Sequence, residues 1–76
     1  MKECNLAQCK PNEWLQVEAI SPSDISDKLL EMGLYQGKQI SIKFTAPFGD
    51  PLAVEIDGGL LSLRRSEAEL IIVKRI

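Results

Sequence analysis

Five stretches of this chain place apolar side chains at every second position, which is the period of a β-strand with one buried face. We predict strands over residues 13–20, 38–46, 51–57, 60–64 and 70–76. The side chains expected to face the core are Leu15, Val17, Ala19, Ile40, Ile42, Phe44, Ala46, Leu52, Val54, Ile56, Leu61, Leu63, Ile71 and Val73. Each strand is short, so several of them have to assemble around one core.

Residues 21–34 follow a different period and predict the main helix. Ile25, Leu29 and Met32 fall at positions i, i+4 and i+7, which places them on one apolar stripe of a helix. Gly33 is positioned to end the helix in the left-handed conformation. A helix of about three turns is too short to be stable alone, so we expect its apolar stripe to lie against the sheet.

The connections between the predicted strands indicate an antiparallel barrel. Residues 57–59, Asp-Gly-Gly, form a strong hairpin signal because glycine supplies the positive φ of a primed turn. Residues 65–69 predict a short helical turn before the last strand. Together these elements predict a mainly β fold, a small five-stranded, closed or half-closed antiparallel barrel over 11–76 with one inserted helix. Residues 1–10 are expected to form a loop or a single turn ahead of this domain.

The composition is that of one ordinary globular domain. The 76 residues are 45% hydrophobic and 26% charged, with a net charge of −2. A slightly acidic chain lacks the broad basic surface of a nucleic-acid binder. The longest apolar run, 70–73, is far shorter than the ~20 residues that span a membrane, and the chain shows no secretory signal. We therefore expect a cytoplasmic protein that neither binds nucleic acid nor inserts into the membrane.

No group of residues predicts a catalytic site. The chain has no histidine, its serines have no evident base, and its carboxylates are scattered over turns and outward strand faces. The glycines at 57–59 precede a strand, whereas a phosphate-binding loop needs a following helix and a lysine. The sequence thus favours a binding protein over an enzyme.

The two cysteines, Cys4 and Cys9, lie within the first ten residues. Their spacing matches neither a C-x-x-C redox motif nor a zinc knuckle, and no histidine is present to complete a metal site. Two interpretations stay open for them: free thiols in a reducing cytosol, or a two-thiolate site for a soft metal, shared between two chains. They are the candidate metal ligands of this sequence.

The segment 46–54 is longer than a hairpin needs, and its composition makes it stiff. Pro47 and Pro51 each hold the preceding residue in an extended conformation, and Asp50 can accept hydrogen bonds from nearby backbone amides. A stiff loop loses little conformational entropy on binding. Phe48, near its tip, either folds back over an open end of the barrel or contacts a partner, and both roles stay open.

A second loop, one charged turn and the single tryptophan complete the candidate surfaces. Tyr35 lies on a short loop between two glycines, and we expect it to be an exposed binding anchor that forms an apolar patch with the phenylalanine loop. Arg64 and Arg65 either pair with Glu67 or dock on an acidic partner. Trp14 is expected to pack over the helix or the N-terminal segment.

From residue 11 to 75 the sequence resembles the FeoA family, the small ferrous iron transport protein A. The resemblance rests on LLEMGLYQGKQISI (29–42), APFGDPLAVEI (46–56) and LSLRRSEAELIIV (61–73), in this order and at this spacing. The chain departs from the family at Asn12, where glycine is usual, and asparagine tolerates the same turn geometry. The cysteine pair does not belong to the family pattern and takes no role from it.

This resemblance implies an SH3-like β-barrel and a non-enzymatic accessory role in ferrous iron uptake. In that role the protein docks on the cytosolic side of FeoB, the membrane iron transporter with a GTPase domain, at the inner face of the membrane. One alternative is a transition-metal-binding or iron-sensing protein that takes Fe2+ or Zn2+. Another is an accessory domain of an iron-dependent transcriptional regulator, because related domains form the C-terminal module of such repressors. Whether the chain forms a homo-oligomer stays open as well.

Overall fold

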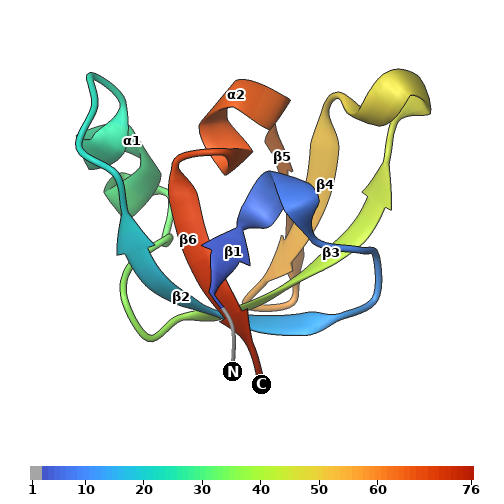
Figure 1. Ribbon diagram of the computed structural model, residues 1–76, viewed down its shortest axis with the longest axis horizontal. Helices are drawn as coiled ribbons and strands as arrows, with labels where there is room; N and C mark the ends of the chain where they lie inside the picture. Colours follow the sequence, from blue (N-terminus) through green and yellow to red (C-terminus); the bar gives the residue numbers. More distant parts are fainter. Residues whose placement is uncertain (1–2) are drawn as a thin grey trace.

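Six antiparallel strands form a single, strongly bent sheet in the computed structural model, which describes residues 3–76. The strands are β1 (Cys4–Asn5), β2 (Trp14–Ile20), β3 (Gln39–Thr45), β4 (Leu52–Ile56), β5 (Gly59–Leu63) and β6 (Ile71–Arg75). Their order across the sheet is β1-β6-β2-β3-β4-β5. The sheet curls into a half-open barrel, as Figure 1 shows. The predicted mainly β barrel is confirmed, with six strands in place of five.

The additional strand comes from the N-terminal segment, which we expected to be a loop or a single turn. β1 pairs with β6, so that Cys4 lies opposite Val73. The 3₁₀ helix η1 (Leu6–Gln8) follows directly and buries Leu6 and Ala7. A strand of two residues is too short to show a period in the sequence, so alternation could not predict it. The first residues that the structure describes therefore contribute to the same core as the rest of the chain.

The main helix is shorter than predicted. α1 spans Ser26–Glu31, whereas the sequence predicted a helix over 21–34. The chain turns just before α1, where Ser23 Oγ accepts a hydrogen bond from the Ile25 N–H at 3.3 Å. Serine side chains readily satisfy backbone groups in this way outside helices. Gly33 follows the helix with a φ of +96°. The prediction that Gly33 ends the helix in the left-handed conformation is thus confirmed.

Most of the predicted inward-facing positions are confirmed. Nine of these side chains are buried, namely Leu15, Val17, Ile40, Ile42, Leu52, Val54, Leu63, Ile71 and Val73. Leu6 from η1, Leu29 from α1 and Leu34 from the following loop complete the same core. Ala46, Ile56 and Leu61 are half-buried at its margin.

Two predicted core positions, Ala19 and Phe44, are exposed instead. The pairing register shifts between Val17 and Ala19 in β2, and between Ile42 and Phe44 in β3. Each shift inserts one extra residue on that strand and turns the following side chain to the other face. As a result, Phe44 is 57% exposed to solvent.

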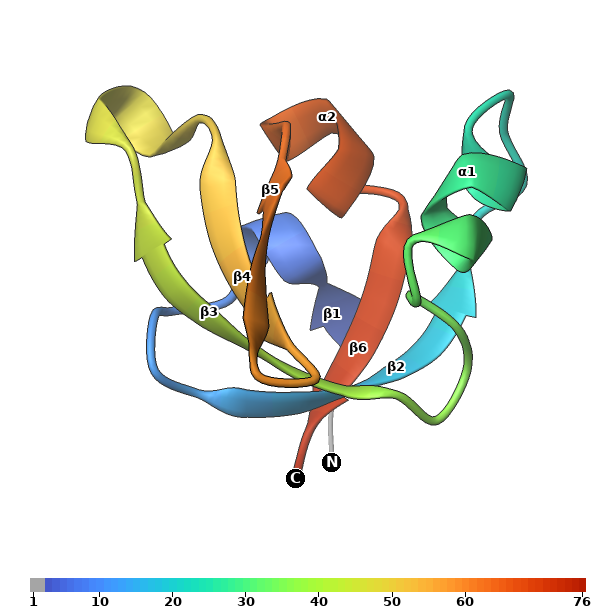
Figure 2. The same cartoon turned by 180° about the vertical axis from the view of Figure 1, so that it is seen from behind.

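Two short helical turns lie at one end of the barrel. η2 (Pro47–Gly49) connects β3 to β4, and α2 (Arg65–Ala68) connects β5 to β6. Figures 1 and 2 place η2, α2 and α1 at this end, whereas the C-terminus and the β4–β5 turn lie at the opposite end. η1 packs against α2. No helix within residues 3–76 is long and apolar enough to cross a membrane.

Candidate functional site

The loop that carries Phe48 is a compact turn with its aromatic side chain pointing into solvent. The Ala46 N–H donates to the Pro51 carbonyl at 3.0 Å, and the Gly49 N–H donates to the Ala46 carbonyl at 2.8 Å. Phe48 has a φ of +69°, an uncommon conformation for a residue with a bulky side chain. Its side chain is fully exposed. The interpretation that Phe48 covers the end of the barrel is therefore wrong, and its contact with a partner stays a prediction.

Asp50 fixes this loop to α2. Its Oδ1 atom accepts a hydrogen bond from the Arg65 N–H at 3.1 Å. We expected Asp50 to hold amides within its own loop, but its partner is 15 residues further along the chain. A β-carbon added to Gly49 would lie 3.3 Å from a terminal guanidinium nitrogen of Arg65, so this side chain lies against the loop backbone. The two segments form one continuous surface.

The arginines of this surface are not paired with Glu67. The Glu67 carboxylate instead accepts a hydrogen bond from the Arg64 backbone N–H at 2.8 Å, which caps α2. Within residues 3–76 the ion pairs are Lys38–Asp57, Lys43–Glu55, Lys74–Glu18 and Arg75–Glu13. Arg64 and Arg65 are exposed residues, and their side chains make none of these pairs.

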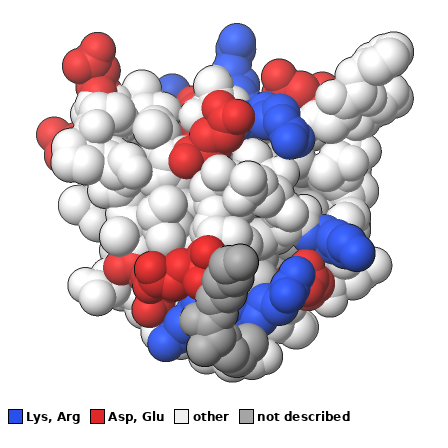
Figure 3. Space-filling model, viewed as in Figure 1, with Lys and Arg blue, Asp and Glu red and all other residues white. Residues whose placement is uncertain are grey.

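Phe48, Asp50, Arg64, Arg65 and Glu67 thus form what we call the loop-end surface. Figure 3 shows basic and acidic side chains together over α2, beside an uncharged protrusion on the side where Figure 1 places η2. An exposed aromatic ring next to unpaired arginines is an arrangement that can bind an apolar pocket with acidic edges. Five of the six partner-binding residues that the sequence predicted therefore lie together.

The sixth, Tyr35, lies elsewhere. The loop that carries it connects α1 to β3, and Figures 1 and 2 place this loop and η2 on opposite sides of the barrel. The expected single patch of Tyr35 and Phe48 is therefore not formed within this chain. Tyr35 is 46% exposed, and the Lys38 ammonium lies 5.5 Å from the centre of its ring.

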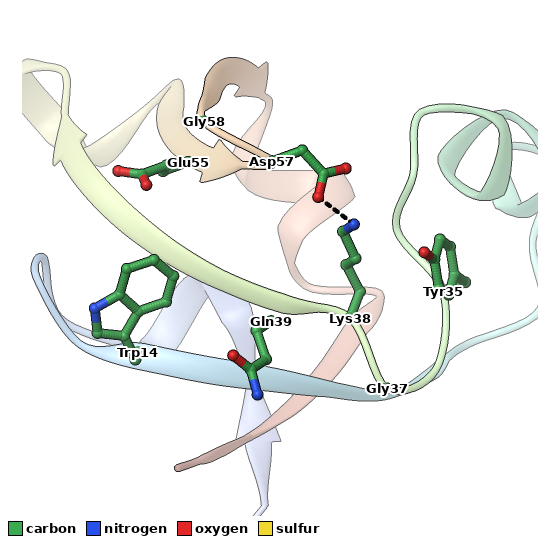
Figure 4. A pocket seen from close by; sticks show the side chains of 8 residues that line it. All are labelled: Trp14, Tyr35, Gly37, Lys38, Gln39, Glu55, Asp57 and Gly58. Carbon is green, nitrogen blue, oxygen red and sulfur yellow. Dashed lines mark hydrogen bonds and ion pairs between the residues drawn. The ribbon is translucent and has the colours of Figure 1, made fainter.

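Tyr35 lines a hollow of about 340 Å³, which we call the tyrosine hollow (Figure 4). Its lining is formed by Trp14, Tyr35, Gly37, Lys38, Gln39, Glu55, Asp57 and Gly58. Trp14, which we expected to pack over the helix or the N-terminal segment, is half-exposed here. The hydrogen bond from Lys38 to Asp57 raises the pKa of the Lys38 ammonium. This ion pair spans the hollow and was not predicted, because neither residue stands in a motif.

The thiols of Cys4 and Cys9 face each other at the edge of the barrel, with their sulfur atoms 3.2 Å apart. Burial, together with the hydrogen bond to Cys4, raises the pKa of the Cys9 thiol to about 12. No group of three or more cysteine, histidine, aspartate or glutamate side chains suited to a metal ion occurs among residues 3–76. The pair offers two ligands, fewer than the four of a structural zinc site.

The bent six-stranded sheet defines a small SH3-like domain. The family profile of the FeoA domain matches residues 4–75, so this chain belongs to the FeoA domain family. The NMR structure of an FeoA-like protein from Clostridium acetobutylicum aligns with a TM-score of 0.91 at 35% identity, covering 100% of this chain and 90% of the other. The FeoA protein of Chlorobium tepidum aligns with a TM-score of 0.86 at 32% identity, covering 95% of this chain and 70% of that protein.

A third similar structure is that of Stenotrophomonas maltophilia FeoA complexed with zinc, described as a procaryotic SH3 domain protein. It aligns with a TM-score of 0.81 at 25% identity, covering 92% of this chain and 88% of that one. A manganese-dependent transcriptional repressor aligns at 20% identity, which shows a shared fold alone. No protein of curated function matches the sequence.

Proposed function

We propose that this chain is a non-enzymatic accessory protein of ferrous iron uptake, which docks in the cytosol on an FeoB-type membrane transporter through its loop-end surface. The choice of this docking site rests on one observation: Phe48 is fully exposed on a loop that is hydrogen-bonded to α2. The iron-uptake context follows from the FeoA domain family. The protein reaches the inner face of the membrane through this partner.

The loop-end surface suits a partner that presents an apolar pocket edged by carboxylates. Aromatic rings buried at the centre of an interface commonly supply most of its affinity, and Phe48 offers a whole ring without uncovering any of the core. Arg64 and Arg65 place positive charge beside it, while the carboxylates of Asp50 and Glu67 are engaged with backbone N–H groups. Charges at the rim chiefly accelerate association and set orientation.

The test is an amide-resolved NMR titration of the whole chain with the soluble cytosolic domain of the transporter, in nucleotide-free and nucleotide-bound forms. We expect shifts over 46–51 and 64–67. Phe48→Ala should weaken binding by about ten-fold or more, as loss of an interface anchor does. Leu30→Ala is the control, because Leu30 is another exposed apolar side chain, 55% accessible on α1.

Tyr35→Ala separates the two candidate surfaces. If the shifts are confined to the tyrosine hollow and Phe48→Ala binds with the affinity of the unaltered chain, the docking site is the tyrosine hollow and not the loop-end surface. Absence of shifts in every nucleotide state, together with no binding to the full-length transporter in lipid nanodiscs, would overturn the proposed role.

Binding of a divalent metal, Fe2+ or Zn2+, is the second candidate, and the zinc complex of the Stenotrophomonas maltophilia protein favours it. The candidate ligands in this chain are Cys4 and Cys9. Anaerobic calorimetric titration with each metal should give a heat of binding that Cys4→Ser, Cys9→Ser abolishes. A doubly substituted chain that binds metal normally would remove the cysteines from this role.

A role as an accessory domain of an iron-dependent transcriptional regulator rests on the shared fold, and a fold by itself does not carry function. A gel-shift measurement at low salt, where nonspecific phosphate contacts are strongest, would detect DNA binding by this chain.

A further inference from the structure

The cysteine pair is held in a fixed relation by the local fold. Cys4 lies in β1, paired with β6, and Cys9 ends η1, where its N–H donates to the Leu6 carbonyl at 3.2 Å. The turn of η1 therefore brings the Cys9 sulfur back over β1, 3.2 Å from the Cys4 sulfur. The two atoms have to approach by only about 1.1 Å to reach the ~2.05 Å of a disulfide bond.

Both cysteines are half-buried, but only one of them lines a hollow. Cys4 lines a hollow of about 320 Å³ together with Glu3, Gln8 and Arg75, and Cys9 is not part of that lining. The Cys9 sulfur lies 3.6 Å from the Asn5 carbonyl oxygen, and both half-buried cysteines pack against the core. A reagent that enters the hollow therefore meets the Cys4 sulfur first.

We propose that Cys4 and Cys9 form a redox modification site that a low-molecular-weight disulfide oxidises reversibly to an intramolecular disulfide. The thiolate of Cys4 attacks one sulfur of the reagent, forms a mixed disulfide and releases one thiolate. The thiolate of Cys9 then attacks the Cys4 sulfur and releases the second. The two protons lost by the cysteines pass to the two released thiolates. Two cysteine thiols are oxidised to one disulfide, and one reagent disulfide is reduced to two thiols.

The assignment of roles follows from the positions of the two sulfur atoms. Cys4 is the attacking thiol because the hollow opens onto it. Cys9 is the resolving thiol, because it does not line the hollow and its sulfur lies 3.2 Å from that of Cys4. Once the mixed disulfide exists, the Cys9 sulfur lies next to the Cys4 sulfur that it attacks. This proximity raises the rate of the intramolecular step.

Oxidation would act on the element that joins the N-terminal segment to the rest of the core. The disulfide closes the short loop that contains η1, and η1 carries Leu6 into the core and packs against α2. Fixing that loop limits the freedom of the unfolded chain and holds η1 in place. The site is separate from the loop-end surface, so it stands whether or not the docking proposal holds.

The test uses the whole chain in anaerobic buffers with increasing ratios of glutathione disulfide to glutathione. Samples are quenched with acid, alkylated and weighed by intact mass spectrometry. We expect a monomer in which both thiols become resistant to alkylation together, with a mass two hydrogens below that of the reduced chain. Dithiothreitol should reverse the change, and digestion should yield one peptide pair linked through Cys4 and Cys9.

The single variants test the order of attack. Cys9→Ser should accumulate a glutathione adduct on Cys4, while Cys4→Ser should react about ten-fold more slowly because its remaining thiol does not line the hollow. Two-dimensional NMR spectra of both variants establish that each is folded. The proposal is overturned if the unaltered chain keeps both thiols open to alkylation at every ratio, or yields only stable glutathione adducts or intermolecular dimers.

Discussion

The Asp50 carboxylate accepts a hydrogen bond from the Arg65 backbone N–H at 3.1 Å, and this contact joins the η2 loop to the first residue of α2. The first N–H groups of a helix have no acceptor within the helix, so a carboxylate at this place is stabilising. The Asp50 side chain thus gives the first N–H group of α2 a hydrogen-bond acceptor and also holds the η2 loop beside this helix. The exposed ring of Phe48 keeps its place relative to the arginines because of this bond.

Asp50→Ala removes the acceptor and should lower the free energy of unfolding by about 1 kcal/mol, the usual cost of losing such a capping side chain. Asp50→Asn keeps an oxygen acceptor at the same place and should cost about a few tenths of a kcal/mol. Urea denaturation measures both values, and hydrogen exchange of the Arg65 amide gives a direct local readout. Equal exchange rates of that amide in the unaltered chain and in Asp50→Ala would show that the bond does not protect it.

Phe48 has an unfavourable backbone conformation, and its side chain contributes no buried surface to the core. Its φ is +69°, a region that glycine occupies without the steric cost of a β-carbon. Phe48→Gly should therefore be more stable than Phe48→Ala by about 1 kcal/mol, while Phe48→Ala should lie within about 0.5 kcal/mol of the unaltered chain. Thermal and urea unfolding of the three proteins test this order. If both variants unfold well before the unaltered chain, the ring contributes to the core after all.

Alternation along the sequence was sufficient to predict five strands and nine buried side chains, because a period of two is visible in segments of five or more residues. It failed at Ala19 and Phe44, where register shifts in β2 and β3 displace the following side chain to the other face. A bulge changes which face a residue occupies without changing the composition of the strand. The two-residue strand β1 leaves no periodic signal at all.

The candidate site was predictable in its members but not in its arrangement. The composition of the two loops indicated Phe48, Asp50, Arg64 and Arg65 as candidate partner-binding residues, and left open whether Phe48 folds back over the barrel end. The contact between Asp50 and Arg65 depends on tertiary structure, because it spans 15 residues and matches no local turn pattern. For the same reason, the separation of Tyr35 from the phenylalanine loop could not be anticipated from their similar chemistry.

Leu6 tests the finding that the N-terminal segment is part of the core. Its side chain is fully buried in η1, although the sequence predicted a loop or a single turn there. Leu6→Ala should lower the free energy of unfolding by about 2–5 kcal/mol, through lost burial and the cavity left behind. Leu60→Ala is the matched control, because Leu60 is 64% exposed on β5, and it should change stability by less than about 0.5 kcal/mol. Equal effects of the two substitutions would mean that η1 is not docked in solution.

Glu13 should make the stability of the fold depend on acid pH. Its carboxylate accepts a hydrogen bond from the Lys10 backbone N–H at 2.9 Å and pairs with the Arg75 guanidinium at 2.6 Å. The hydrogen bond from Lys10, reinforced by the charge of Arg75, lowers the pKa of Glu13 below its ordinary value of 4.5. A carboxyl group with a lower pKa in the folded chain stabilises the fold above the unfolded pKa, and this stabilisation is lost as pH falls through the folded pKa.

Glu13→Gln should therefore be less stable than the unaltered chain at neutral pH, and the difference should shrink as the pH falls below about 4.5 towards the folded pKa. Urea midpoints at several pH values measure this difference, and NMR titration of the Glu13 side-chain carboxyl carbon gives its folded pKa directly. Glu69→Gln controls for the loss of one negative charge, since Glu69 is exposed and makes no ion pair within residues 3–76. A stability difference between Glu13→Gln and the unaltered chain that stays constant across the acid range would rule out a depressed pKa as its source.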